Sequence, residues 1–206
     1  RKGYFETLIH FSSSEAYGDL INFPMSEEHP LNITTPYAAS KASADLLVLS
    51  YSKTFETDVT ILRPFNNFGP RQNEKAYAGI IPTVIQTILQ GESPIIFGDG
   101  EQTRDYIYVK ETAKASIRAL KHPETKGNVI NIASGQEITI NHIVSKICDI
   151  MNSSKRPIYR EPRVGDLRRH CADIQKAKKL MNFNYEISFD EALETTIDWY
   201  VKRLSR

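Results

Sequence analysis

Strand-like and helix-like segments alternate along the 206-residue chain. Short apolar runs predict strands, and apolar residues spaced by three and four predict helices. We expect strands at residues 7–12, 59–63, 94–97 and 127–133, and a short extended segment at 106–110. We expect helices at residues 36–55, 80–90, 112–120, 140–151, 174–180 and 189–203. Because a strand, a helix and a strand come first, we expect a parallel crossover and an α/β protein.

The composition is that of an ordinary globular chain, 40% hydrophobic and 25% charged, with a formal net charge of +1. This balance argues against nucleic acid or an anionic membrane as the main partner. No apolar run approaches about 18 residues, so we expect a cytoplasmic protein without a membrane anchor. The two cysteines are too few for a disulfide framework, and the five histidines lack metal-ligand spacing. We therefore expect reduced thiols and no metal site.

The pattern Tyr37-Ala-Ala-Ser-Lys41 opens the helix expected at residues 36–55. Residues four apart share a helix face, so the ammonium can favour the phenolate of the tyrosine. Such a tyrosine can take a proton from a sugar hydroxyl while a hydride leaves the same carbon. A second copy, from Tyr106 to Lys110, falls in an extended segment, where residues four apart are too distant to share a proton. We interpret the second copy as accidental.

Five motifs follow one another along the chain. They are Ser12-Ser-Ser-Glu-Ala-Tyr-Gly18, Pro36-Tyr-x-x-Ser-Lys41, Arg63-Pro-Phe-Asn-Asn-x-Gly-Pro-Arg71, Gly98-Asp-Gly-x-Gln-x-Arg-Asp-Tyr106 and Arg163-x-Gly-Asp166. In this order they resemble the extended short-chain dehydrogenase/reductase family of NAD-dependent nucleotide-sugar epimerases, 4,6-dehydratases and decarboxylases. The resemblance extends from Thr7 to about Tyr200. It implies the C-terminal part of a Rossmann-type parallel sheet plus a smaller mixed α/β substrate-binding subdomain.

The resemblance also implies how the chain is divided. Residues 1–65 would form the C-terminal half of the NAD-binding domain, and residues 103–135 would return to it. Residues 66–102 and 136–206 would form the nucleotide-sugar-binding subdomain.

None of the ten glycines forms the Gly-x-x-Gly-x-x-Gly turn that holds a dinucleotide pyrophosphate at a helix N-terminus. The family places this turn upstream of the catalytic tyrosine. We therefore expect the chain to lack that N-terminal segment and to need it as a partner. The strands at 7–12 and 59–63 would then have lost their inner neighbours and would expose a sheet edge.

The catalytic roles follow from the resemblance, position by position. Tyr37 would be the base, and Lys41 would lower its pKa and hold the nicotinamide ribose of NAD. Ser13 would donate or accept a hydrogen bond at the sugar 4-hydroxyl. Ser14 and Glu15 stand where dehydratases and decarboxylases of the family carry a polar residue followed by a glutamate.

Further positions implied by the resemblance concern ligand binding. Pro64 and Phe65 lie where backbone groups meet the nicotinamide amide. Arg104 and Arg163 match arginines that clamp the nucleotide ribose and diphosphate, which suits their planar charged forks. His170 either donates to phosphate or lies on the surface. The expected substrate-binding set is Asn66, Gly79, Ile80, Ile95, Phe97, Arg104, Arg163 and Asp166.

Glu15 bears on the choice of reaction, because elimination needs a group for the C5 proton that simple 4-epimerization does not. We favour a 4,6-dehydratase acting on a UDP- or dTDP-sugar. A 4-epimerase and a UDP-glucuronate decarboxylase remain as alternatives, as does a non-catalytic binding module or an inactive fragment. The family also implies a homodimer through the helix bearing Tyr37 and Lys41. The apolar residues available for it, which core packing explains equally well, are Leu46, Leu47, Leu49 and Tyr51.

Overall fold

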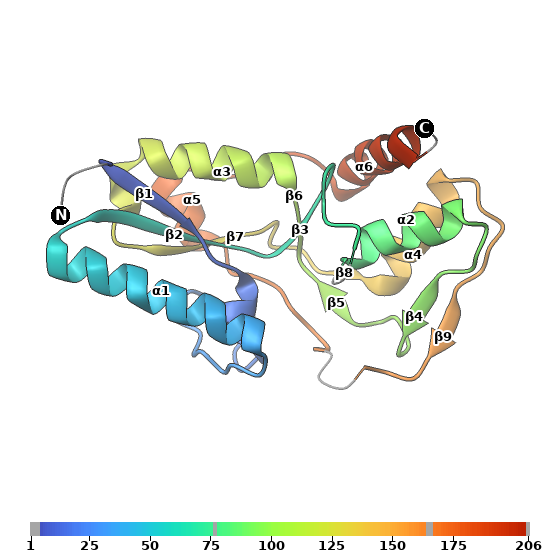
Figure 1. The fold of residues 1–206 in the computed structure, drawn as a ribbon, viewed down its shortest axis with the longest axis horizontal. Helices are drawn as coiled ribbons and strands as arrows, with labels where there is room; N and C mark the ends of the chain where they lie inside the picture. The colour runs from blue at the N-terminus through green and yellow to red at the C-terminus, as the bar shows by residue number, and fades with distance from the viewer. Residues whose placement is uncertain (1–4, 76–77, 164–166, 205–206) are drawn as a thin grey trace.

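Two groups of elements lie side by side along the long axis of the molecule (Figure 1). The computed structural model describes residues 5–75, 78–163 and 167–204. The first group is a three-stranded sheet with its covering helices: β1 (Thr7–Phe11), α1 (Pro36–Phe55), β2 (Asp58–Pro64), α3 (Val109–Lys121), β7 (Val129–Ile132) and α5 (Gln175–Met181). A 3₁₀ turn, η1 (Ser14–Tyr17), follows β1, and a second one, η2 (Pro123–Thr125), follows α3.

The second group is built from helices and short strands. Its elements are α2 (Ile80–Leu89), β4 (Ile95–Phe97), β5 (Thr103–Arg104), β8 (Ile138–Thr139), α4 (Ile140–Ile150), β9 (Ile158–Arg160) and α6 (Phe189–Leu204). Strands β4 and β9 pair in parallel, and β5 and β8 pair antiparallel. Between the two groups, β3 (Asn66–Phe68) pairs in parallel with β6 (Tyr106–Tyr108).

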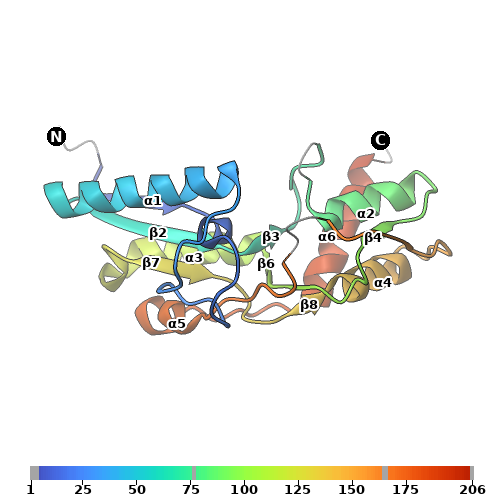
Figure 2. The same cartoon turned by 90° about the horizontal axis from the view of Figure 1, so that it is seen from below.

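Strand β2 lies at the centre of the sheet, between β1 and β7. Both neighbours run parallel to it, with Thr7 opposite Asp58 and Ile61 opposite Val129. Residues 59–63 are all buried, as in a parallel strand that is covered on both faces. Helix α1 covers one face, and α3 and α5 cover the other (Figure 2). The α/β fold class expected from the sequence is therefore confirmed.

The expected loss of neighbours is wrong for residues 59–63, because β2 is paired on both sides. The expectation holds better for β1. Within the described residues β1 pairs with β2 alone, and Leu8 and Phe11 on it are exposed. Within the described residues β1 and β7 are thus the two edge strands of the sheet, and β2 is not an edge.

Two boundaries differ from the sequence-based expectation. Helix α3 begins at Val109 rather than at residue 112, directly after β6. Helix α5 belongs to the first group, because Ala177 and Met181 pack with Ile130 of β7. Residues 136–206 therefore do not all lie in the second group, as the expected division had them. No helix within the described ranges is long and apolar enough to cross a membrane.

Candidate active site

Helix α1 carries the Tyr37 and Lys41 pair. The Thr35 hydroxyl oxygen accepts a hydrogen bond from the Ala38 amide, and Pro36 occupies the first turn, which suits its fixed φ. The helix therefore begins one residue before Tyr37. The Tyr37 side chain is 55% exposed, so its phenol is accessible rather than packed in the core.

Lys41 connects this helix to the end of β1. Its Nζ atom donates a hydrogen bond of 3.2 Å to the carbonyl oxygen of Phe11 and lies 5.9 Å from the centre of the Tyr37 ring. Phe11 is the last residue of β1, two residues before Ser13. The structure thus brings the Tyr37 and Lys41 pair to the strand end from which the serine motif continues.

The serine motif forms the 3₁₀ turn η1, which packs against α1. The Ser13 hydroxyl oxygen caps the turn by accepting a hydrogen bond of 3.2 Å from the Glu15 amide. Ser14 is buried, whereas Glu15 is exposed. Gly18 ends the motif at φ +71°, and a Cβ atom there would lie 1.7 Å from the Asn32 carbonyl oxygen, so no other residue fits this turn without rearrangement.

A cavity of about 360 Å³ lies in the second group, where α2, β4 and β5 meet the β3 and β6 pair. Six of the eight substrate-binding positions expected from the sequence line it: Asn66, Ile80, Ile95, Phe97, Arg104 and Arg163. Gly79 is the N-cap of α2, directly before Ile80. Asp166 lies outside the described residues. The structure therefore brings together side chains from segments up to almost 100 residues apart.

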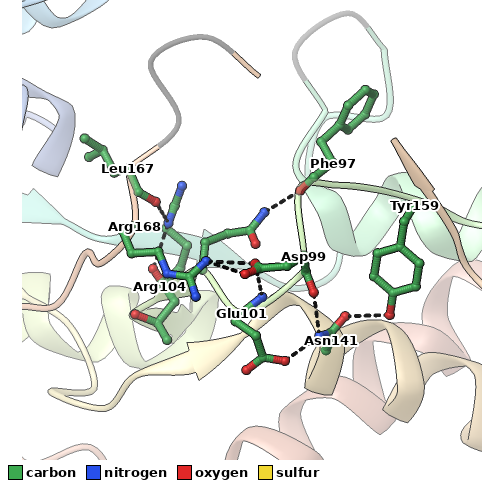
Figure 3. A network of polar contacts seen from close by, with 10 residues as sticks. Phe97, Asp99, Glu101, Arg104, Asn141, Tyr159, Leu167 and Arg168 are labelled. Atoms are coloured by element: carbon green, nitrogen blue, oxygen red, sulfur yellow. Dashed lines mark hydrogen bonds and ion pairs between the residues drawn. The ribbon is translucent and has the colours of Figure 1, made fainter. Parts of the chain in front are cut away.

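Two arginines, Arg104 and Arg163, line this cavity. The Nη1 atom of Arg104 donates hydrogen bonds of 2.8 and 2.7 Å to the carbonyl oxygens of Thr103 and Leu167, which hold its side chain (Figure 3). The guanidinium carbon of Arg163 lies 4.1 Å from the centre of the Phe97 ring. Stacking occupies one guanidinium face and leaves the N–H donors at its edge directed outward, as anion binding requires.

A second, more open cavity of about 740 Å³ shares Phe97, Gln102 and Arg163 with the first. Asp99, Tyr159 and Arg168 line it and belong to a polar network (Figure 3). The Nη1 atom of Arg168 donates to both carboxylate oxygens of Asp99, at 2.8 and 2.9 Å. These bonds hold the pKa of Asp99 below its usual value. The site accordingly extends past the positions expected from the motifs.

Asn66 and its neighbours form the wall nearest the sheet. The Asn66 side-chain amide donates to the Asp105 carbonyl oxygen at 2.9 Å, and its Nδ2 atom lies 3.4 Å from Nδ1 of His170. The His170 ring is buried and lies 4.8 Å from the ring of Phe65. Burial, with the nearby Arg104 charge, lowers the pKa of His170 to about 4. His170 is therefore a buried, neutral residue at pH 7, and its interpretation as a surface histidine is wrong.

Pro64 is the last residue of β2, and Phe65 lies between β2 and Asn66, the first residue of β3. The Phe65 amide already donates a hydrogen bond of 2.9 Å to the Ile132 carbonyl oxygen. Proline has no amide hydrogen. Any backbone contact from these two residues to a ligand must therefore use their carbonyl oxygens.

Known protein families and structures similar to this chain are nucleotide-sugar enzymes. The family model for GDP-mannose 4,6-dehydratase matches residues 5–196. The chain belongs to this family of nucleotide-sugar dehydratases and epimerases. A protein described as a putative UDP-glucose 4-epimerase of Methanocaldococcus jannaschii is 36% identical over 200 residues, which cover 97% of this chain and 64% of that protein.

Solved structures include both activities of the epimerase/dehydratase family. The UDP-N-acetylglucosamine 4-epimerase of Methanobrevibacter ruminantium, in complex with UDP-N-acetylmuramic acid, is 40% identical with a TM-score of 0.91. The match covers 97% of this chain and 64% of that structure's chain. The dTDP-glucose 4,6-dehydratase of Bacillus anthracis, in complex with NAD, is 31% identical with a TM-score of 0.86, and 97% of this chain covers 63% of it. The chain thus spans slightly less than two thirds of these family members.

Motif reasoning within the epimerase/dehydratase family missed the network on the second cavity. Asp99 lies in the Gly98-Asp-Gly100 turn, and Arg168 follows Arg163 by five residues. The Tyr159 hydroxyl donates to the side-chain oxygen of Asn141, whose amide donates to the Asp99 carbonyl oxygen (Figure 3). The only sequence feature that pointed to this network was the position of Asp99 in the Gly98 to Tyr106 motif. Its pairing with Arg168 depends on tertiary structure.

Proposed function

We propose that this chain carries the proton-transfer and nucleotide-sugar-binding part of an NAD-dependent enzyme that modifies a nucleoside-diphosphate sugar through a 4-keto intermediate. The observation that carries this proposal is the single cavity lined by Asn66, Arg104 and Arg163. Its two arginines offer charged forks for a diphosphate. Lys41 contacts Phe11 at the carboxyl end of β1, close to the accessible Tyr37. The parallel neighbour β2 ends two residues before Asn66, which lines the cavity.

The first step is oxidation of the sugar at C4. The Tyr37 phenolate takes the proton of the 4-hydroxyl group, the C4–H bond breaks, and the C4=O bond forms. NAD⁺, held by Tyr37, Lys41 and the backbone of Pro64 and Phe65, would supply the acceptor for the C4 hydride. The Ser13 hydroxyl orients the 4-hydroxyl group. The Lys41 ammonium lies one helix turn further along α1, with its Nζ atom 5.9 Å from the centre of the Tyr37 ring.

The residues in this chain fit the nicotinamide half of such a cofactor. Tyr37 is accessible, and the Lys41 ammonium has three donors, of which one is used by the Phe11 carbonyl oxygen. The other two can donate to ribose hydroxyls. The carbonyl oxygens of Pro64 and Phe65 can accept from an amide. These four residues are the ones we assign to cofactor binding.

Glu15 supports dehydration as the second step. It is exposed on η1, in the same turn that Ser13 caps. In the 4-keto sugar, Glu15 takes the C5 proton and passes it to the C6 hydroxyl group, which leaves as water. Loss of water leaves a C5=C6 double bond. The hydride then returns to C6 as a proton from solvent adds to C5, and Tyr37 releases to solvent the proton it took from the 4-hydroxyl group. The proposed product is a 4-keto-6-deoxy sugar, and Ser14 holds the turn from its buried position.

A 4-epimerase is the second candidate, because proteins described as 4-epimerases are 36% and 40% identical to this chain, above the 31% of the dehydratase. In that reaction the 4-keto sugar turns over and receives the hydride back at C4 on its other face. No C5 proton moves, so Glu15 has no chemical step. Decarboxylation of a UDP-glucuronate is the third possible outcome of the same first oxidation.

Product analysis tests these reactions directly. The whole protein is incubated with NAD and with UDP-glucose, dTDP-glucose or UDP-glucuronate, and the sugars are followed by NMR. A 4-keto-6-deoxy sugar supports dehydration. A mixture of C4 epimers without loss of water supports epimerization, and release of carbon dioxide supports decarboxylation. No conversion of any of the three contradicts the proposed function.

We also propose that α1 forms a homodimer interface. Leu46 and Leu47 are about 60% exposed, and Tyr51 and Phe55 are exposed on the same helix. Exposed apolar residues grouped on one element are typical of an interaction surface. Leu49 is partly buried and contributes less to it than the sequence suggested.

A further inference from the structure

Helix α1 contacts the sheet through few side chains. Its buried residues are Ala38, Ala42 and Asp45. Val48 and Leu49 are only partly buried, so few apolar side chains of α1 are fully buried. A specific polar contact adds to this packing in setting the direction of α1 and the position of Tyr37.

Asp45 supplies such a contact. Its Oδ2 atom accepts hydrogen bonds from Ser12 Oγ at 2.8 Å and Arg63 Nε at 2.9 Å, and it forms an ion-pair contact with Arg63 Nη2 at 2.8 Å. Its Oδ1 atom lies 3.4 Å from His10 Nε2. Ser12 directly precedes Ser13, and Arg63 lies in the central strand β2. One carboxylate thus joins α1 to the serine motif and to the sheet.

The same arginine holds the η1 turn. The guanidinium carbon of Arg63 lies 4.5 Å from the centre of the Tyr17 ring, and Tyr17 ends the turn that contains Glu15. The Tyr17 hydroxyl donates to the side-chain oxygen of Asn131 in β7 at 2.6 Å. Burial raises the pKa of Tyr17 to about 12, so the hydroxyl keeps its proton at neutral pH. Arg63 therefore lies between the two segments that carry the proposed acid/base residues.

We propose that the Asp45 and Arg63 ion pair positions Tyr37 and Lys41 on α1 against Ser13 and Glu15. This inference rests on the proposed function. The pair is almost fully buried, and two nitrogens of Arg63 contact the same Oδ2 atom of Asp45, which restricts how the two side chains can move against each other. Neither side chain touches the reacting atoms. A buried ion pair is weak evidence for added stability, whereas fixed geometry is its better-attested role.

Displacement of a reacting group by about 1 Å can cost about 10²-fold in rate. The variant Asp45→Asn keeps the shape of the side chain and removes the charge that orients the Arg63 fork. Because it leaves a buried guanidinium unpaired and can prevent folding, Ser12→Ala is the second variant. It removes one hydrogen bond to Asp45 and leaves no buried charge unpaired. Asp58→Asn is the matched control, because Asp58 pairs with Lys126 at the exposed opposite end of β2.

The variants are compared in the whole protein with NAD and whichever nucleotide sugar the wild type converts. We expect kcat to fall about 10²-fold for Asp45→Asn and about fivefold for Ser12→Ala, the equivalent of one hydrogen bond. The KM for the sugar and the affinity for UDP should stay within about twofold of wild type, since the substrate cavity lies elsewhere. Deuterium at C4 should slow these variants more than it slows wild type.

The positioning role is overturned if Ser12→Ala, or a folded Asp45→Asn, keeps the wild-type kcat and isotope effect. It is also overturned if KM and UDP affinity change as much as kcat, because this indicates general loss of structure. A wild-type protein that converts no nucleotide sugar contradicts the proposed function, and the inference with it. An active wild type with unaffected variants contradicts the inference alone.

Discussion

The Arg163 guanidinium stacks on the Phe97 ring, with its central carbon 4.1 Å from the ring centre. Arg163 is therefore held against strand β4, which contains Phe97. This contact fixes the plane of the fork that we assign to the diphosphate. Lysine can neither stack in this way nor form two parallel hydrogen bonds. We expect Arg163→Lys to weaken UDP binding about tenfold, from the loss of one charge-assisted hydrogen bond.

Calorimetric titration of the whole protein with UDP measures this change. Arg156→Lys is the matched control, because Arg156 is exposed and lies outside both cavities. A dissociation constant for Arg163→Lys within about twofold of wild type would show that the stacked fork does not bind the nucleotide.

The role of Glu15 separates dehydration from epimerization. We expect Glu15→Gln to lower formation of a 4-keto-6-deoxy sugar by about 10²–10⁴-fold, as for loss of a positioned acid/base group. Reduction of bound NAD by the sugar should continue, since Tyr37 and Ser13 are unchanged. Glu28→Gln, in the exposed loop that follows, controls for the change of charge. Normal dehydration by the Glu15 variant would remove this residue from the mechanism.

His170 predicts a loss of stability in acid. Its pKa lies near 4 in the folded protein and near 6.5 in the unfolded chain. Below pH 6.5 the unfolded chain binds a proton that the folded protein excludes. The contribution of His170 is therefore complete above pH 6.5 and is lost as the pH falls toward 4. The loss amounts to about 3 kcal/mol between pH 7 and pH 4.

Denaturant unfolding at both pH values tests this prediction. The free energy of unfolding should fall by about 3 kcal/mol less in His170→Gln than in wild type. His142→Gln, at an exposed site, should follow the wild type. If the free energy of unfolding changed equally with pH in wild type and His170→Gln, the folded protein would protonate His170 as readily as the unfolded chain, and the prediction would be wrong.

The exposed face of α1 predicts the oligomeric state. A double change, Leu46→Glu with Leu47→Glu, places two like charges in the proposed dimer interface and should convert a dimer to a monomer. Light scattering coupled to size exclusion measures the mass. Leu204→Glu, at another exposed leucine, should leave the mass unchanged. If the double variant keeps the dimer mass, α1 is not the interface.

Local signals were sufficient for some elements. Helix α1 has the bounds expected from its Thr35 cap, Pro36 and apolar spacing. Strand β9 was not predicted, because all three of its residues are exposed and its partner β4 lies about 60 residues earlier. The start of α3 was missed because the apolar alternation of residues 106–108 runs directly into the helix without a break in pattern.

In the candidate site, too, some residues could be located from local motifs and others could not. Motifs located the cavity-lining residues Asn66, Arg104 and Arg163 one by one, and the fold brings them together. The burial of His170 and the pairing of Asp45 with Arg63 have no local signature. They depend on how α1 and the 168–173 segment pack on the sheet, so sequence patterns alone did not reveal them.

Replacement of Tyr37 tests the central claim most directly. The variant Tyr37→Phe removes one hydroxyl from an exposed side chain and should preserve the fold. We expect kcat with NAD and the nucleotide sugar to fall about 10²–10⁴-fold, with UDP affinity unchanged. Tyr108→Phe is the matched control, because the Tyr108 hydroxyl has no hydrogen-bond partner among the described residues. An unchanged kcat for Tyr37→Phe would contradict the assignment of Tyr37 as the base and the chemistry proposed for this site.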